Sequence, residues 1–160
     1  MPPSQLILGE YSRTLDERHR LSIPSEMAEL LVADDGLCVL AKQRPGALSL
    51  WSRTRWGNQI DAAVEIVNCK LATHRLENRI PQLQEFGRLL STRHSEVSLA
   101  GRSRLVIPES FRGFLGVEPG GDVVLVGASV CIELWNPAQW LQYQHEKMDN
   151  FDTLLDLLVS

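Results

Sequence analysis

Alternation of polar and apolar residues marks two similar points in the chain. In residues 20–23, Arg20 and Ser22 face one way and Leu21 and Ile23 the other, which is typical of a half-buried strand. Residues 104–107 begin in the same way with Arg104 and Leu105, but Val106 stands where the first stretch has Ser22. A proline follows each stretch and suits the first turn of a helix, where a missing N–H has no cost. The pattern therefore predicts a short strand and then a helix. The first helix starts at Pro24 and is closed by Asp34-Asp35-Gly36, and the second spans residues 108–115.

These stretches belong to a longer tandem repeat. Arg20 corresponds to Arg104, 84 positions later, and this offset holds without a gap over more than forty positions. The same offset relates Leu15 to Leu99, Arg18 to Arg102, Leu21 to Leu105, Ile23 to Ile107, Pro24 to Pro108, Gly36 to Gly120, Leu50-Trp51 to Leu134-Trp135, and Trp56 to Trp140. Each copy predicts two strands, a helix, two strands and a further helix. A unit of about forty residues cannot bury both faces of its sheet, so we expect the copies to pack as one barrel-like domain with exchanged strands.

Other hydrophobic patterns complete the predicted order of elements. Strands are predicted at residues 6–15, 37–42, 47–51, 96–99, 123–126 and 130–135. Ser52 is a plausible N-cap for a long connecting helix that Pro81 interrupts. Asn136-Pro137 predicts the start of a helix at 137–147, followed by another at 150–158. The expected organisation is a first repeat at 6–56, connecting helices at 57–92, a second repeat at 93–140 and a helical tail at 141–160.

Charge and cysteine content indicate the class of ligand and the cellular compartment. The chain of 160 residues has a net charge of −4, but residues after Trp140 carry −3 of it, and 13 of the 16 basic residues are arginine. Arginine suits bidentate contact with phosphate or guanine. Cys38, Cys69 and Cys131 lack metal-ligand spacing, and we interpret them as buried thiols in a reducing compartment. A signal peptide and a membrane helix are not expected.

The motif Leu15-Asp16-x-x-x-Arg20-Leu21-Ser22-Ile23-Pro24 resembles the DxxxR motif of MraZ proteins. The resemblance covers roughly residues 7–145. It includes, in the second half, Arg88-Leu89-Leu90, Arg104-Leu105-Val106-Ile107-Pro108, Val124-Leu125-Val126-Gly127 and Ile132-Glu133-Leu134-Trp135 followed by Trp140.

This resemblance implies an α+β, β-rich fold: a tandem, pseudo-symmetric double-psi/swapped-hairpin AbrB-like barrel with connecting and C-terminal helices. It also implies a cytoplasmic, nucleoid-associated bacterial transcription factor. Such a protein binds short repeats in double-stranded promoter DNA upstream of the division and cell wall gene cluster, as a homo-oligomeric ring. No cofactor, metal, membrane or small-molecule substrate is expected.

Two positions depart from the family pattern. The second copy has Ala100 where the first has Asp16, so its motif is AxxxR. The glycine that usually precedes the motif arginine is replaced by His19 and by Ser103. That glycine serves a tight turn, and histidine tolerates positive φ better than serine does, so the turn geometry of the second copy stays open, with Gly101 as another solution.

Basic residues at the two turns are the candidate DNA contacts. We assign this role to Arg13, Arg18, His19, Arg20, Arg102 and Arg104, and a shaping role to Asp16, Pro24 and Pro108. Structural alternatives stay open for several of them. Arg20 and Asp16 can simply pair with each other, Arg104 can pair with Glu109, and Arg18, Arg102 and His19 can be solvated surface residues.

The remaining apolar patterns indicate structural roles, and the remaining polar residues argue against an enzymatic function. We expect the repeated tryptophans to anchor the core, and the stripe Ile60-Val64-Val67-Leu71 to face the core or a subunit interface. Phe151 and Leu154-Leu155-Leu157-Leu158 suggest a docking segment between neighbouring copies. The four histidines are dispersed, and no phosphate loop or nucleophile elbow is present, so an enzyme is not expected. The rival hypothesis is an oligomeric assembly module that has lost DNA binding.

Overall fold

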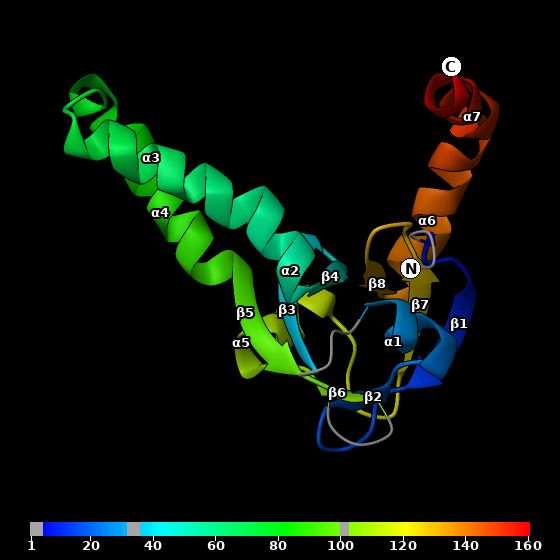
Figure 1. The fold of residues 1–160 in the computed structure, drawn as a ribbon. Helices are drawn as coiled ribbons and strands as arrows, with labels where there is room; N and C mark the ends of the chain where they lie inside the picture. Colours follow the sequence, from blue (N-terminus) through cyan, green and yellow to red (C-terminus); the bar gives the residue numbers. More distant parts are fainter. Residues whose placement is uncertain (1–4, 32–35, 100–102) are drawn as a thin grey trace.

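The computed structural model describes residues 5–31, 36–99 and 103–160 (Figure 1). Its strands are β1 (Glu10–Thr14), β2 (Arg20–Ser22), β3 (Leu37–Arg44), β4 (Ala47–Ser52), β5 (His94–Ser98), β6 (Arg104–Val106), β7 (Asp122–Gly127) and β8 (Ile132–Trp135). Its α-helices are α1 (Ser25–Leu31), α2 (Arg53–Trp56), α3 (Ala62–Ala72), α4 (Ile80–Arg93), α5 (Glu109–Leu115), α6 (Pro137–Lys147) and α7 (Phe151–Val159). A π-helical turn (Gly57–Asp61) joins α2 to α3, and 3-10 turns (Glu77–Arg79 and Met148–Asn150) precede α4 and α7.

Strands of the two repeats are interleaved in antiparallel sheets. In the described part of the chain, one sheet has the order β1-β7-β8-β4-β3-β5, and a separate ribbon pairs β2 with β6. β1 of the first copy pairs with β7 of the second, and β5 of the second pairs with β3 of the first. The order is the same when the copies are exchanged, as a pseudo-twofold repeat requires. The predicted α+β class and the exchange of strands are both observed.

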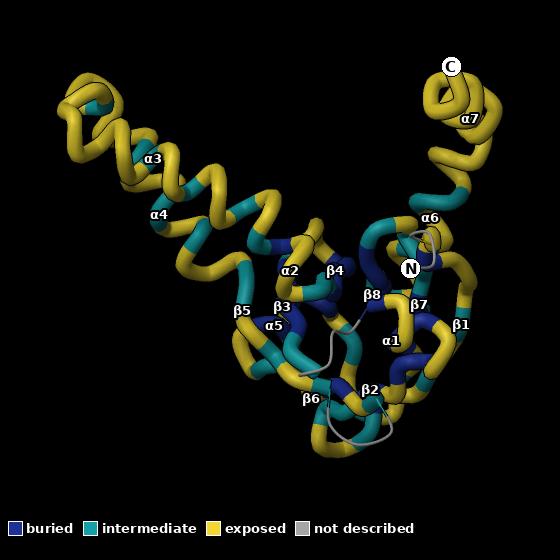
Figure 2. The backbone as a smooth tube through the Cα atoms, viewed as in Figure 1, coloured by how far each residue is buried: buried dark blue, intermediate teal, exposed yellow. Residues whose placement is uncertain are grey.

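The main core lies between the large sheet, the β2–β6 ribbon, α1 and α5. Leu21, Leu105, Ile107, Phe111 and Leu115 are almost fully buried in it. Figure 2 shows the buried backbone concentrated in this body, whereas the helices that project from it are mostly exposed. Burial of apolar surface at about 25 cal/mol per Å² makes this body the stable part of the molecule.

Repeat symmetry extends to the outer face of the sheet. Nε1 of Trp51 donates a hydrogen bond to Oγ of Ser49, and Nε1 of Trp135 donates one to Oε1 of Glu133, at the equivalent position. Ser49 and Glu133 also face each other across β4 and β8. Burial raises the pKa of the Glu133 carboxyl, against the hydrogen bond from Trp135 that lowers it. The expectation that the tryptophans anchor packing is confirmed for Trp135 and for Trp56, which are both buried.

Three local expectations differ from the structure. The first strand, β1, is shorter than the predicted strand at residues 6–15. Gly9 has φ +124° and separates the bridge at Ile7 from β1. The connecting helix is interrupted before Pro81, at residues 73–79, and Pro81 lies in the first turn of α4. Cys69 is exposed on α3, so the prediction of three buried thiols is wrong at that position.

Two helical projections leave the body in diverging directions (Figure 1). Residues 53–93, from α2 to α4, form a helical hairpin that we call the arm, and residues 137–160, with α6 and α7, form the tail. None of the described helices is sufficiently long and apolar to cross a membrane.

Candidate nucleic-acid interface

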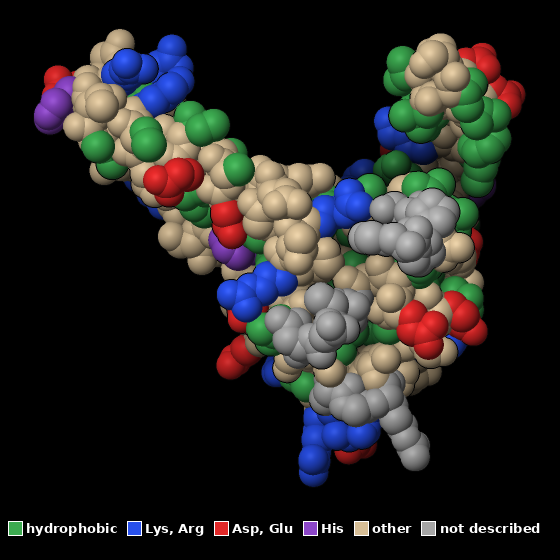
Figure 3. All heavy atoms as spheres, viewed as in Figure 1, with side chains coloured by type: hydrophobic (Ala, Val, Ile, Leu, Met, Phe, Trp, Pro, Cys, Tyr) green, Lys and Arg blue, Asp and Glu red, His purple; other side chains and the backbone are tan. Residues whose placement is uncertain are grey.

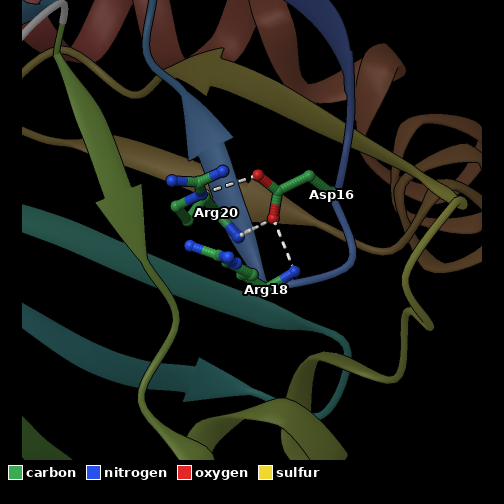
Figure 4. A network of polar contacts seen from close by, with 3 residues as sticks. All are labelled: Asp16, Arg18 and Arg20. Carbon is green, nitrogen blue, oxygen red and sulfur yellow. Dashed lines mark hydrogen bonds and ion pairs between the residues drawn. The ribbon is translucent and has the colours of Figure 1, made fainter.

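The first repeat turns at residues 16–19 around the side chain of Asp16 (Figure 4). Oδ1 of Asp16 accepts hydrogen bonds from the backbone N–H groups of Arg18 and Arg20, both at 2.8 Å. Its Oδ2 pairs with Nε of Arg20 at 2.7 Å. An aspartate that satisfies the backbone two residues on is a common way to shape a turn. The side chains of Arg18 and Arg20 extend to the same side of β2.

Hydrogen bonding lowers the pKa of the Asp16 carboxyl. The largest cause is the backbone N–H of Arg20, opposed by partial desolvation and reinforced by the Arg20 side chain and the Arg18 backbone. Because the pKa is lower in the folded than in the unfolded chain, ionised Asp16 stabilises the turn above its unfolded pKa. That contribution is lost as the pH falls through the lowered pKa.

We predict that the Asp16 carboxyl titrates with a midpoint below 3.8, its ordinary value. The carbon-13 chemical shift of the side-chain carboxyl, followed against pH, measures this midpoint directly. In Arg20→Ala the midpoint should rise only part of the way, because the backbone N–H of residue 20 remains. A midpoint at or above 3.8 in the native chain would contradict the turn geometry.

The turn residues before both motif arginines are left-handed, which settles the turn geometry that the sequence left open in the second copy. His19 has φ +58° and Ser103 has φ +57°. The carbonyl of His19 accepts the N–H of Ile107, and the carbonyl of Ser103 accepts the N–H of Ile23, both at 2.9 Å. These reciprocal hydrogen bonds tie the two copies of the motif together.

A side chain at positive φ is strained, so Ser103→Gly should stabilise the protein. We expect a gain of about 0.5–1 kcal/mol in the free energy of unfolding, measured by urea denaturation, because glycine removes the Cβ clash. Ser22→Gly is the matched control in the extended strand β2, where the same change should destabilise by a similar amount. Equal or lower stability of Ser103→Gly would refute the strain at this turn.

Register in the β2–β6 ribbon gathers residues of both motifs on one surface. Arg20 pairs with Val106, Leu21 with Leu105, and Ser22 with Arg104. Leu21 and Leu105 point into the core. The alternating residues Arg20, Ser22, Arg104 and Val106 are partly or fully exposed, and we call them the ribbon face. The two arginines are diagonal neighbours, a relation that places residues about 7–8 Å apart. Lysine and arginine side chains gather at this end of the molecule (Figure 3).

The remaining candidate residues occupy different settings. Arg18 is exposed at the turn, and His19 is half-buried. Arg13 lies farther back on β1, where its guanidinium sits 5.4 Å from the centroid of the Tyr11 ring and donates to the Ser12 carbonyl. Arg102, like Ala100, lies outside the described residues. The structure thus brings Arg18, Arg20 and Arg104 to the ribbon end of the molecule and gives Arg13 local partners.

Two of the structural alternatives are resolved by the contacts. Arg20 does pair with Asp16, while 35% of its side chain stays exposed, so the pair orients this arginine without burying it. Between the described residues Arg104 and Glu109 there is no ion pair, and Arg104 is exposed. Pro24 and Pro108 immediately precede α1 and α5. Their carbonyls accept N–H groups of the first helical turns, from Met27 and Ala28 and from Phe111.

Sequence reasoning missed two members of the ribbon face. Ser22 and Val106 lie beside the motif arginines, and Val106 is 48% exposed although it is apolar. The period of two that placed Arg20 and Ser22 on one face was the available signal for Ser22. No feature of the sequence predicted that Val106 is exposed, because its neighbour Leu105 is equally apolar and is buried.

The described residues offer no candidate metal site. Residues 5–31, 36–99 and 103–160 contain no group of three or more histidine, cysteine or acidic residues that can hold a metal ion. Burial raises the pKa of the Cys131 thiol to about 12, with the Glu133 carboxylate adding to the effect, so this thiol is protonated at neutral pH.

Comparison with known proteins identifies the family. The family model described as "MraZ protein, putative antitoxin-like" matches residues 91–157. The transcriptional regulator MraZ of Thermus thermophilus is 30% identical over 132 residues, which cover 82% of this chain and 83% of that protein. The chain belongs to the MraZ family. MraZ of Pediococcus pentosaceus is 28% identical over 155 residues, with 97% of this chain and 98% of the relative covered.

Membership of the MraZ family confirms two expectations. These relatives are named transcriptional regulators, and the family is not one of enzymes, in agreement with the absence of catalytic motifs from the sequence. MraZ of Alkaliphilus metalliredigens, 27% identical over 149 residues, carries the same name. Transcription regulation is therefore the functional class of the chain.

Proposed function

We propose that this MraZ-family chain is a sequence-specific DNA-binding regulator that reads promoter DNA with the ribbon face. The observation that carries the proposal is the β2–β6 register, which puts arginines from both repeats on one exposed antiparallel ribbon. A ribbon of this width fits the major groove, where guanidinium groups bind guanine edges or phosphates. Val106 adds methyl groups of the kind that contact thymine.

The proposal keeps the residue roles that the sequence predicted. Arg13, Arg18, His19, Arg20, Arg102 and Arg104 are proposed as DNA contacts, while Asp16, Pro24 and Pro108 shape the two turns. Asp16 holds Arg20 through Nε, which orients the guanidinium before DNA arrives. An oriented side chain loses less conformational freedom on binding, and its contacts therefore contribute more affinity.

The proposed architecture assigns reading and assembly to different parts. The repeats at 6–56 and 93–140 form one swapped-hairpin, AbrB-like double-psi barrel that carries the ribbon. The connecting helices at 57–92 and the C-terminal helical segment at 141–160 serve assembly into a ring. Such a ring presents one ribbon per subunit to a promoter with several short repeats, upstream of the division and cell wall gene cluster. Affinity then arises from many weak contacts. A net charge of −4 is compatible with this, because a basic face attracts DNA locally.

Binding to the protein's own upstream promoter DNA tests the proposal. A gel-shift titration at about 50 and 200 mM salt, against scrambled DNA of equal length, should show preference for the promoter and a steep loss of affinity with salt. Equal affinity for both DNAs, or no binding at low salt, would reject DNA reading. With a stable oligomer still present, that result would favour the assembly-module function instead.

A further inference from the structure

The arm and the tail both expose apolar surface that the body does not cover. No residue of the described helices α3, α4, α6 and α7 is buried. α7 has only nine residues, and a helix of that length is marginal in water without tertiary packing. Both projections therefore need a partner surface.

The tail helix α7 has the pattern of a docking helix. Phe151, Leu154, Leu155 and Leu158 recur at the spacing of one helix face, and their exposed fractions run from 47% to 79%. Asp152 and Asp156 fall between these positions. A helix of this kind binds by laying its apolar face in a hydrophobic groove, with leucines and phenylalanine as anchors.

A groove of matching chemistry lies where the arm meets the outer face of the sheet. It is a hollow of about 300 Å³ between α4 and the segment that begins the arm, with Ala41 and Ser49 among the residues that line it. Most of its remaining wall is apolar, formed by Trp51, Trp56, Ile60, Phe86, Leu89 and Leu90. Arg93 is also in the lining, which supplies a cation next to the apolar surface.

Net charge indicates which surfaces meet. In residues 53–93 of the arm, seven basic residues outnumber four acidic ones, a net +3. Residues 137–160 of the tail contain four acidic residues and one lysine, which gives a net charge of −3. Arm-to-arm or tail-to-tail contact brings like charges together, whereas arm-to-tail contact pairs opposite ones. Within one copy, arm and tail diverge, and Figure 3 shows acidic side chains at the end of the tail and basic ones on the arm.

We propose that α7 of one copy docks in the arm groove of the next copy, with Leu154 and Leu158 as anchors and Asp152 and Asp156 near Arg88 and Arg93. The contact is head to tail, so each copy uses its arm once and its tail once. Repetition of such a heterologous contact builds a closed ring when the rotation allows it. This inference rests on the proposed function for the ring itself. It adds which two surfaces of the subunit make the contact.

Two complementary variants test the contact. The tail variant carries Leu154→Asp and Leu158→Asp, and the arm variant carries Phe86→Asp and Leu89→Asp. Loss of buried anchors should weaken association by at least about 30-fold in each. In light scattering after gel filtration, each variant alone should then run as a monomer of 18.0 kDa. Mixed together, they retain one intact arm and one intact tail, and should form a heterodimer of twice that mass and nothing larger.

Other outcomes overturn the proposal. A native chain that is monomeric, an arm variant that still self-associates, or a mixture that stays monomeric each excludes head-to-tail docking. Charge variants keep the test valid if an aspartate in the groove disturbs folding. Asp152→Lys with Asp156→Lys, and separately Arg88→Glu with Arg93→Glu, change only exposed positions. Each pair should weaken the assembly, and mixing the two should restore an arm-to-tail contact.

DNA binding is measured separately on the same variants. A monomeric tail variant that still binds a single promoter repeat at low salt supports the ribbon assignment, whatever the assembly result. A native ring that does not distinguish promoter from scrambled DNA supports the docking and rejects the proposed function. The two proposals therefore fail in distinguishable ways.

Discussion

Arg20→Ala is expected to reduce affinity for a single promoter repeat by about 5- to 150-fold, the range of 1–3 kcal/mol for one good arginine contact. The loss should be larger on promoter DNA with several repeats, because every subunit is affected in the same way. Removal of Arg20 also leaves the Asp16 carboxylate without its side-chain partner beside the DNA. Arg104→Ala leaves the pair between Asp16 and Arg20 intact. It should therefore reduce affinity less than Arg20→Ala does.

Titration by fluorescence anisotropy at several salt concentrations measures this effect. The slope of log affinity against log salt should fall by about 1 for each phosphate that the variant no longer neutralises. Stability should change little, since ion pairs that are open to solvent contribute little to the free energy of unfolding. Arg20→Lys keeps the charge but loses the planar fork, so recovered affinity without recovered preference for promoter DNA would indicate base contact.

Arg79→Ala is the matched control. It removes the same charge from an exposed position on the arm, distant in sequence from either motif. Its affinity for promoter DNA should equal that of the native chain. If Arg20→Ala and Arg104→Ala also bind like the native chain, the arginines of the ribbon face do not contact DNA.

Leu105→Ala is expected to be the most destabilising of the proposed substitutions. Leu105 is fully buried and lies opposite Leu21 on the inner side of the ribbon. A leucine-to-alanine change in a packed core costs about 2–5 kcal/mol, from lost transfer energy and the cavity that remains. Of a typical total stability of about 5–15 kcal/mol, this is a large fraction. Urea denaturation followed by tryptophan fluorescence measures it.

Val106→Ala separates core packing from strand propensity. It changes the next residue of β6, which points outward, and it should alter the free energy of unfolding by no more than about 0.5 kcal/mol. Similar losses in the two variants would mean that Leu105 does not pack in the core. Leu105→Ala should weaken DNA binding only under conditions where it unfolds the chain.

Local chemistry allowed much of the fold to be predicted. The repeat at an offset of 84 residues gave the order of elements twice, and turn residues, caps and periodicity placed most strands and helices within a few positions. Residue type alone left the turn before Arg104 open, and only the structure shows Ser103 at positive φ. Pro81 misled the prediction, because a proline in the first turn of a helix marks a start as readily as an interruption.

The candidate site was predictable residue by residue but not as a surface. Asp16, Arg18 and Arg20 are close in sequence, so their shared turn follows from their spacing. Arg104 is distant in sequence, and its place beside Ser22 depends on the register of β2 with β6. A shift of one residue would send every ribbon side chain to the opposite face. The exposure of Cys69 was missed for a related reason, since apolar spacing on α3 does not say whether anything covers the helix.

Residue identity and spacing along the chain were enough to establish the repeat, the α+β class, the turn chemistry and the family resemblance. The three-dimensional arrangement was needed to show which strands pair, which residues share the ribbon face, and that the arm and tail stand apart with uncovered apolar surfaces. Those features depend on contacts between residues distant in sequence, and it is the packing of the whole core that selects among the possible pairings.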